Sequence, residues 1–383
     1  MRFIVFCTVS ACASPQLELP LGPSPLGPFR ALEEELVPLE QRDQPTAPRQ
    51  SLAQRMRARG VPGVSVALIR KGQVEWVHGA GWRSAETRAP VANDTQFSVG
   101  SVSKVVNAAL ILRLVGAGLL DLDADVNGYL KRWRVPDSEF KGPVTLRQIL
   151  SHTAGFTQHG FADYQPGEEL PTLLQTLNGS GPAKNDPIVV DFTPGSDMRY
   201  SGGGVQVSQL VIEDVTGLSY EQAARTYVFE PLKMSRSTFA EPTGNVACAH
   251  DSDGKPRALP RCYESMPESA ASGLWTTAGD LGKFVVAIMG DEAFLPASLR
   301  AEMASRVPGS WHGLGPRVNG KALHHGGAND SYRAWIEGHP ESGDGVVILT
   351  NGEGGRPLAY ELRLAVERAY GWDVHFPDDF KAP

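Results

Sequence analysis

The sequence predicts a fold of the α+β (α/β) class, in which an antiparallel sheet is flanked by helices and an all-helical lobe is inserted. Strand-like apolar runs occur near both ends of the chain, within 64–78 and 332–350. The region from about 119 to 270 instead contains helical segments and long Pro/Gly loops. We therefore expect the two ends of the chain to pair in one sheet, with the helical lobe beside it.

The N-terminal part of the predicted domain begins at residue 29. Charged, periodic sequence over 29–59 favours helices, with a break near 44–48. Val64–Arg70 and Gln73–His78 read as two strands, and the Lys71-Gly72 pair between them predicts a hairpin. These strands open the antiparallel sheet.

A helix with a broad buried face is predicted after Ser101. Its apolar residues recur at three- and four-residue steps, at Val105, Ala108, Ala109, Leu112 and Val115. That period places them on one side of a helix, and the side is wide enough to pack inward. Ser101 is therefore expected at the start of a buried helix.

The C-terminal part supplies the remaining sheet and helices. Thr277-Ala-Gly-Asp280 resembles a capping box, with Asp in place of the usual Glu, and predicts a helix to about Met289. Strand-like stretches follow at Tyr332–Glu337 and Gly345–Thr350. An amphipathic helix is predicted over Leu358–Tyr370.

Composition limits the classes of function. The chain has 383 residues, of which 41% are hydrophobic and 21% charged, with a net charge of −7. This is ordinary globular composition, and we expect one large domain over 29–383. No basic cluster is interleaved with aromatic residues, so nucleic acid is not an expected partner. No run is long and apolar enough to span a bilayer.

Residues 1–28 are interpreted as a leader and tether. Arg2 precedes a short apolar run, and Val9-Ser10-Ala11-Cys12 resembles a bacterial lipobox, whose cysteine is lipidated after cleavage. The apolar run is short for a signal peptide, so an unstructured N-terminus is the alternative. Residues 13–27 repeat Pro-Leu-Gly and read as an extended tether. A lipidated Cys12 would imply a cell-envelope or periplasmic protein anchored to the membrane.

Of the four cysteines, Cys7 and Cys12 belong to this leader, and Cys248 and Cys262 bracket a polar loop. In an exported protein they are candidates for a disulfide that staples this loop, although sequence does not establish the pairing. A metal site with His250 is the alternative. Its spacing fits no common zinc pattern, and we expect neither a metal nor a cofactor.

The chemistry suggested by the sequence centres on Ser101 and Lys104. Residues three apart on a helix share a face, so the amine lies about one turn from the hydroxyl. Burial disfavours the ammonium form, and a neutral amine in reach can take the proton of a serine nucleophile. The helix N-terminus adds N–H groups for an oxyanion. The alternative is a helix-capping serine beside a solvated lysine. The spacing alone is weak evidence for catalysis, because Ser252 and Lys255 have it too, in a polar loop with no apolar helix behind it.

Two further segments are candidates for proton transfer and for the oxyanion hole. Tyr200 precedes a glycine-rich turn, 202–204, that allows close approach of a substrate. A phenol near a lysine ammonium can be held partly ionised and so move protons. His324-His325-Gly326-Gly327-Ala328 precedes the predicted strand at 332 and offers open backbone at a sheet edge, where an N–H can bind an oxyanion. The alternatives are a packing tyrosine and a structural or metal-binding histidine pair.

Taken together, these segments resemble the serine β-lactamase and penicillin-binding-protein-like hydrolases, in the class C β-lactamase/esterase branch. The resemblance runs from about Gly60 to Trp372 and rests on the order and spacing of modest motifs. Besides the segments above, these are 61–68 (VPGVSVAL), 118–123 (GLLDLD), 145–155 (TLRQILSHTAG), 193–195 (TPG), 231–234 (PLKM), 273–280 (GLWTTAGD) and 346–351 (VVILTN).

The resemblance implies a role for each matching residue. Ser101 would be the acylated nucleophile, Lys104 its activating partner and Tyr200 the tyrosine base. The backbone N–H groups of Ser101 and Ala328 would form the oxyanion hole. His325-Gly326-Gly327 matches the third motif, where many members have Lys-Thr-Gly, and by register His325 fits better than His324. His152 falls in a segment that is structural in this family.

Two departures from the family pattern bear on the substrate. The second motif is usually Tyr-x-Asn, but here Gly202 stands where the amide would contact a substrate carbonyl. Histidine replaces the lysine of the third motif, so a permanent cation facing a substrate carboxylate is lost or becomes pH-dependent. Both departures weaken the case for a β-lactamase or DD-carboxypeptidase.

The leading hypothesis is therefore a serine hydrolase that acts through an acyl-enzyme, on a carboxylic ester first, or on a small D-amino-acid peptide. The alternatives are a β-lactamase or DD-carboxypeptidase, and a non-catalytic binding or sensor protein of the envelope. The sequence leaves the oligomeric state open.

Overall fold

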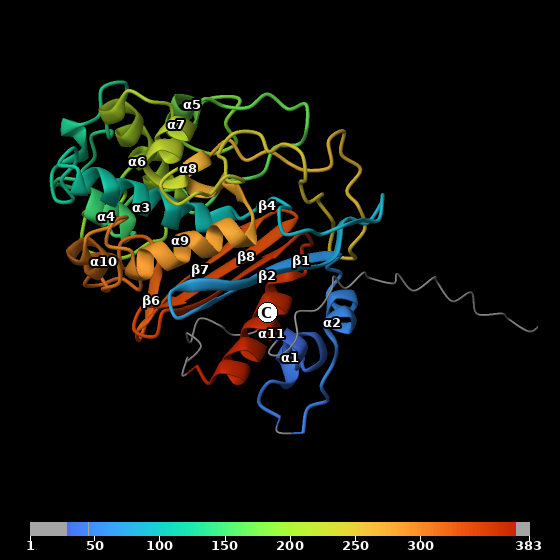
Figure 1. Cartoon of the computed structure of the whole chain (residues 1–383). Coiled ribbons are helices and arrows are strands. Elements are labelled where there is room, and N and C mark those ends of the chain that lie inside the picture. Colours follow the sequence, from blue (N-terminus) through green and yellow to red (C-terminus); the bar gives the residue numbers. More distant parts are fainter. Residues whose placement is uncertain (1–28, 45, 373–383) are drawn as a thin grey trace, which may run out of the picture.

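A seven-stranded antiparallel sheet forms the centre of the computed structural model, which describes residues 29–44 and 46–372 (Figure 1). In spatial order its strands are β3 (Ala89–Pro90), β2 (Gln73–Ser84), β1 (Gly63–Arg70), β9 (Asp344–Thr350), β8 (Tyr332–His339), β7 (Ala322–Asn329) and β6 (Arg317–Asn319). β1 pairs with β9 from Val64 opposite Thr350 to Ile69 opposite Gly345, so the two ends of the chain meet in one sheet as predicted. The predicted leader and Cys12 lie outside the described residues.

Helices cover both faces of the sheet. The short helices α1 (Phe29–Glu34) and α2 (Leu52–Ala58) lie with α11 (Gly355–Tyr370) on one face, and α9 (Ala278–Gly290) lies on the other (Figure 1). The remaining helices are α3 (Ser103–Gly116), α4 (Leu146–Leu150), α5 (Leu173–Asn178), α6 (Gly202–Thr216), α7 (Tyr220–Ala224), α8 (Ser269–Ser272) and α10 (Ala297–Met303). Short turns of helix are η1 (Leu39–Gln41), η2 (Gly100–Val102), η3 (Val126–Gly128) and η4 (Arg225–Phe229).

β1 shows why both faces of the sheet are covered. Its alternate residues enter two different cores: Val64, Val66 and Leu68 pack towards α1, α2 and α11, whereas Ala67 and Ile69 pack towards the helical side. Side chains of a strand point alternately to opposite faces, so a continuous apolar run needs cover on both sides. The predicted arrangement of a sheet flanked by helices is confirmed.

The helical region of the chain is held at its two ends by a small ladder. β4 (Phe97–Ser98) pairs with β5 (Trp275–Thr276), which brings Phe97 opposite Thr276. The helices α3 to α8 lie between these strands in sequence. The ladder therefore fixes where this region leaves the sheet and returns to it. Ser101 lies shortly after β4, in the turn η2.

β2 is longer than the sequence predicts, because it continues past His78 to Ser84. Gly79 and Gly81 lie in this extension. A Cβ added at Gly79 would lie 2.7 Å from the side chain of Val91, and one at Gly81 would overlap the carbonyl oxygen of Pro62. These glycines therefore mark close approaches of neighbouring chain rather than the end of the strand.

Cys248 and Cys262 form a disulfide, with their Cα atoms 4.8 Å apart. It closes the polar loop that contains Ser252 and Lys255. His250 does not join these cysteines as a metal ligand; its Nδ1 lies 2.9 Å from the carbonyl oxygen of Asn351. Within 29–44 and 46–372, no helix has both the length and the apolar character needed to cross a membrane.

Candidate active site

Ser101 lies in the turn η2, directly before the buried helix α3. Most of α3 is buried on every side, in agreement with its predicted apolar face. The hydroxyl of Ser103 donates to the carbonyl oxygen of Gly100 (2.6 Å) and accepts from the N–H of Leu274 (3.0 Å), which ties this turn to the chain entering β5. The position of Ser101 is therefore fixed by both β4 and β5.

Lys104 lies one turn further on, as the spacing predicts. Its Nζ is 3.0 Å from the Oγ of Ser101 and donates to the carbonyl oxygen of Ala271 (2.7 Å). The residue is only 3% exposed. Burial disfavours the ammonium ion and lowers the pKa of Lys104 to about 7. A substantial fraction of this amine is therefore neutral at neutral pH.

Tyr200 lies beside this pair. The Nζ of Lys104 is 5.0 Å from the centre of the phenol ring, and the phenol hydroxyl hydrogen-bonds with Ser101. Burial raises the pKa of Tyr200 to about 12, although the hydrogen bond with Ser101 and the charge of Arg317 oppose this rise. The expectation of a partly ionised phenol is therefore wrong. Desolvation outweighs both of these effects, and the phenol stays protonated.

Four imidazole rings surround Tyr200. Their centres lie 4.3, 4.9, 5.9 and 6.1 Å from that of the phenol, for His152, His159, His312 and His325 respectively. His152 also accepts a hydrogen bond from the backbone N–H of Ser201 at its Nδ1 (3.2 Å). It thus holds the backbone next to Tyr200. Burial lowers the pKa of His152 well below its ordinary value, so the ring is neutral.

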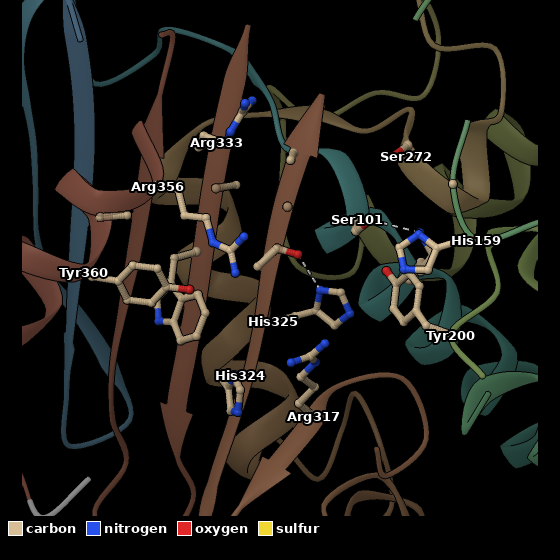
Figure 2. A pocket seen from close by; sticks show the side chains of 18 of the residues that line it. Ser101, His159, Tyr200, Ser272, Arg317, His324, His325, Arg333, Arg356 and Tyr360 are labelled. Atoms are coloured by element: carbon tan, nitrogen blue, oxygen red, sulfur yellow. Dashed lines mark hydrogen bonds between the residues drawn. The ribbon is translucent and has the colours of Figure 1, made fainter. Parts of the chain in front are cut away.

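The histidine pair precedes strand β8, as the sequence suggested, but it also lies within a strand of its own, β7, which the sequence did not predict. His325 pairs with Ile336 of β8, and its ring faces Tyr200 (Figure 2). His324 points to the opposite face and stacks on Trp335, with ring centres 5.1 Å apart. Burial, followed by the charges of neighbouring His312 and Lys104, lowers the pKa of His325 well below its ordinary value. The third motif therefore presents a neutral imidazole.

Glycines bring the edge of β7 against the turn that carries Ser101. A Cβ added at Gly327 would overlap the carbonyl oxygen of Val99 and lie 3.2 Å from the backbone nitrogen of Ser101. A Cβ at Gly100, which has φ +50°, would lie 2.6 Å from the backbone nitrogen of Ala328. Only residues without a side chain allow this approach. The backbone nitrogens of Ser101 and Ala328 therefore lie on two segments that pack directly against each other.

Gly202 follows Tyr200 at the start of α6. A Cβ built on it would lie 3.1 Å from both the carbonyl oxygen of His159 and a ring carbon of Phe161. The N–H of Gly202 also donates to His159 O (3.0 Å). The loop 159–161 therefore packs closely against position 202 and leaves little room for a side chain there.

A cavity of about 310 Å³ opens onto these residues. Besides Ser101, Lys104, Tyr200 and the 324–328 segment, its lining includes several side chains that sequence reasoning missed: His159, Phe161, Ser272, Arg317, Trp335, Arg356 and Tyr360. None of these lies in a motif. Arg317 reaches the site only because β6 pairs with β7, and Arg356 and Tyr360 only because α11 packs on the sheet.

Comparisons with known proteins agree with this arrangement. The Beta-lactamase family model matches residues 49–370. Penicillin-binding protein 4 of Amycolatopsis lactamdurans is 28% identical over 320 residues, which cover 76% of this chain and 81% of that protein. Esterase EstB of Burkholderia gladioli is 28% identical over 286 residues, covering 66% and 72%. The octameric penicillin-binding protein homologue from Pyrococcus abyssi superposes with a TM-score of 0.70 at 26% identity, covering 84% of this chain and 76% of that one.

Proposed function

Because this chain belongs to the Beta-lactamase family and is a serine hydrolase, we propose that it hydrolyses carboxylic esters through an acyl-enzyme on Ser101. One observation carries the proposal. A buried amine whose pKa is lowered to about 7 lies 3.0 Å from a serine hydroxyl, and both groups line a cavity. This is the arrangement that makes a hydroxyl nucleophilic.

In the proposed acylation step, neutral Lys104 takes the proton of Ser101 as Oγ bonds to the ester carbonyl carbon. The backbone N–H groups of Ser101 and Ala328 stabilise the resulting oxyanion. The bond to the alcohol then breaks, and the protonated phenol of Tyr200 donates its proton to the leaving oxygen. Lys104 in turn returns a proton to Tyr200. In the second half of the reaction, water takes the place of the alcohol and attacks the acyl carbon. The proton transfers then run in the opposite direction, and the acid is released from Ser101.

Two features favour esters over β-lactams and peptides. The first is Gly202, which has no amide to contact a substrate carbonyl and against which the loop 159–161 packs closely. The second is the neutral imidazole of His325 in place of a permanent cation. Both alter the contacts that would recognise the amide and the carboxylate of a β-lactam or of a peptide C-terminus. The relative named as an esterase, EstB, is consistent with this preference.

The proposal is tested with a substrate panel of 4-nitrophenyl esters, a chromogenic cephalosporin and a D-Ala-D-Ala peptide. We expect kcat/KM for the best ester to exceed that for the other two classes by at least about ten-fold. Ser101→Ala serves as the background for every substrate. Faster turnover of the cephalosporin or of the peptide would instead favour the β-lactamase or carboxypeptidase alternative.

The dependence of activity on pH follows from the two pKa shifts. Lys104 must be neutral to act as a base, so kcat/KM is expected to rise with pH through about 7 and then to level off. Tyr200 loses its proton only near pH 12, so no decline is expected below about pH 10. A pH–rate profile on a neutral ester measures this directly. An acid optimum would contradict the role of Lys104.

A further inference from the structure

The attack of water on the acyl-enzyme needs a base, and Tyr200 alone is a poor one. If the steps of acylation simply ran backwards, this phenol would accept the proton of the water. Burial raises the pKa of Tyr200 to about 12, so at neutral pH the phenol still holds its own proton. It must lose that proton before it can accept another. A neutral base beside Tyr200, open to water, would remove this requirement.

Of the four imidazole rings around Tyr200, one is open to water. The other three belong to buried residues, at most 3% exposed, and each uses its Nδ1 in a hydrogen bond with the backbone: His152, His312 and His325. His159 is instead exposed and lines the cavity, and neither of its ring nitrogens hydrogen-bonds with another described residue. A water molecule can therefore reach a ring nitrogen of His159.

The loop that carries His159 is fixed to the segment that carries Tyr200. The hydroxyl of Ser201 donates to the carbonyl oxygen of Thr157 (2.7 Å), and the N–H of Gly202 donates to that of His159 (3.0 Å). The ring centres of His159 and Tyr200 lie 4.9 Å apart. The backbone therefore holds the two rings as neighbours in the free protein, before any substrate binds.

His159 also lies on the side of Ser101 at which the alcohol leaves. Tyr200 protonates the leaving alcohol and hydrogen-bonds with Ser101, so the alcohol departs, and water arrives, beside this phenol. Figure 2 shows the rings of His159 and Tyr200 together next to Ser101. Partial burial, followed by the charges of Lys104 and Arg317, lowers the pKa of His159 below its ordinary value. The ring is therefore neutral at neutral pH and can accept a proton.

We propose that His159 is a further catalytic residue, which takes the proton of the attacking water during deacylation. This inference rests on the proposed ester hydrolysis. The water oxygen bonds to the acyl carbon as its proton moves to a ring nitrogen of His159. When the bond from that carbon to the Oγ of Ser101 breaks, the phenol of Tyr200 gives its proton to Oγ. The imidazolium of His159 then restores the proton of Tyr200, and Lys104 stays neutral for the next cycle.

Pre-steady-state kinetics with 4-nitrophenyl butyrate separates the two half-reactions. 4-Nitrophenolate leaves without taking a proton, so its first equivalent reports acylation alone. We expect His159→Phe to release this equivalent at the wild-type rate, and then to deacylate with a rate constant lowered by about 10²–10⁴-fold, the usual contribution of a positioned base. Intact-mass spectrometry should show a butyryl adduct on Ser101 that accumulates in the variant. Phosphonylation of Ser101 by a fluorophosphonate should keep its wild-type rate.

Two further variants distinguish a missing base from a disturbed site. His339, the last residue of β8, lies outside the described lining of the cavity, and its ring is also close to an aromatic ring, 4.7 Å from that of Trp372. His339→Phe should leave both half-reactions at their wild-type rates. His159→Ala leaves space for a free imidazole molecule, so added imidazole should restore deacylation in this variant. It should have no such effect on His159→Phe, in which the space is filled.

The outcomes separate this inference from the function on which it rests. Wild-type deacylation in His159→Phe, or an equal fall in acylation and deacylation, would overturn the role of His159 and leave ester hydrolysis intact. Slow deacylation in His159→Ala that imidazole does not restore would likewise contradict its role as a base. A wild-type protein that releases no nitrophenolate and forms no butyryl adduct would contradict the proposed function itself.

Discussion

Lys104→Met is expected to lower kcat/KM for esters by about 10²–10⁴-fold, the usual contribution of a positioned general base. Methionine keeps the length and the apolar stem of the side chain but cannot accept a proton. The hydroxyl of Ser101 then has no amine within 3.0 Å. The residual activity is also expected to lose its rise through about pH 7, because the group that titrates there is gone. Steady-state kinetics over pH 5–9 measure both effects.

The chain offers a matched control for this variant. Lys255 has the same spacing from Ser252 as Lys104 has from Ser101, but it is exposed and ion-paired with Asp253. Lys255→Met should therefore leave kcat/KM unchanged. Near-normal turnover by Lys104→Met, with its folding verified by circular dichroism, would remove the lysine from the mechanism.

Gly327→Ala is expected to lower kcat by about 10²–10³-fold, as loss of an oxyanion-hole donor does. The added methyl group would overlap the carbonyl oxygen of Val99, so β7 must move away from the Ser101 turn. That movement separates the backbone nitrogens of Ser101 and Ala328. Overpacking of this kind also costs about 1–3 kcal/mol of unfolding free energy. Kinetics and thermal unfolding measure the two effects separately.

Gly290→Ala is the control for the glycine substitution. Gly290 ends α9, and no atom lies within 4 Å of a Cβ built there. Alanine should leave activity unchanged and should stabilise the helix slightly. Wild-type kcat in Gly327→Ala would show that the close approach of β7 to the Ser101 turn does not matter for catalysis.

Local spacing was sufficient to predict the pair at the centre of the site. Ser101 and Lys104 are one helical turn apart, so a buried helix fixes their proximity whatever surrounds it. Val64–Arg70 likewise reads as a strand because every residue before Arg70 is apolar or small enough to be buried on one face or the other. In both cases the determining interactions lie within a few residues in sequence.

Strand register and burial were not predictable in the same way. The sequence does not show that β6 ends opposite His324, and it is this register that exposes the edge of β7 and brings Arg317 into the cavity. The shift of the Tyr200 pKa was predicted in the wrong direction. A nearby lysine suggested an ionised phenol, but the phenol pKa depends mainly on a burial that only the fold determines.

The central claim is that Ser101 is the nucleophile, and intact-mass spectrometry after treatment with a fluorophosphonate tests it most directly. We expect one phosphonyl adduct on the wild-type protein, located on the peptide that contains Ser101, and the same adduct on Ser252→Ala. The Ser101→Ala protein should remain unmodified. An adduct of equal yield on Ser101→Ala would contradict the account.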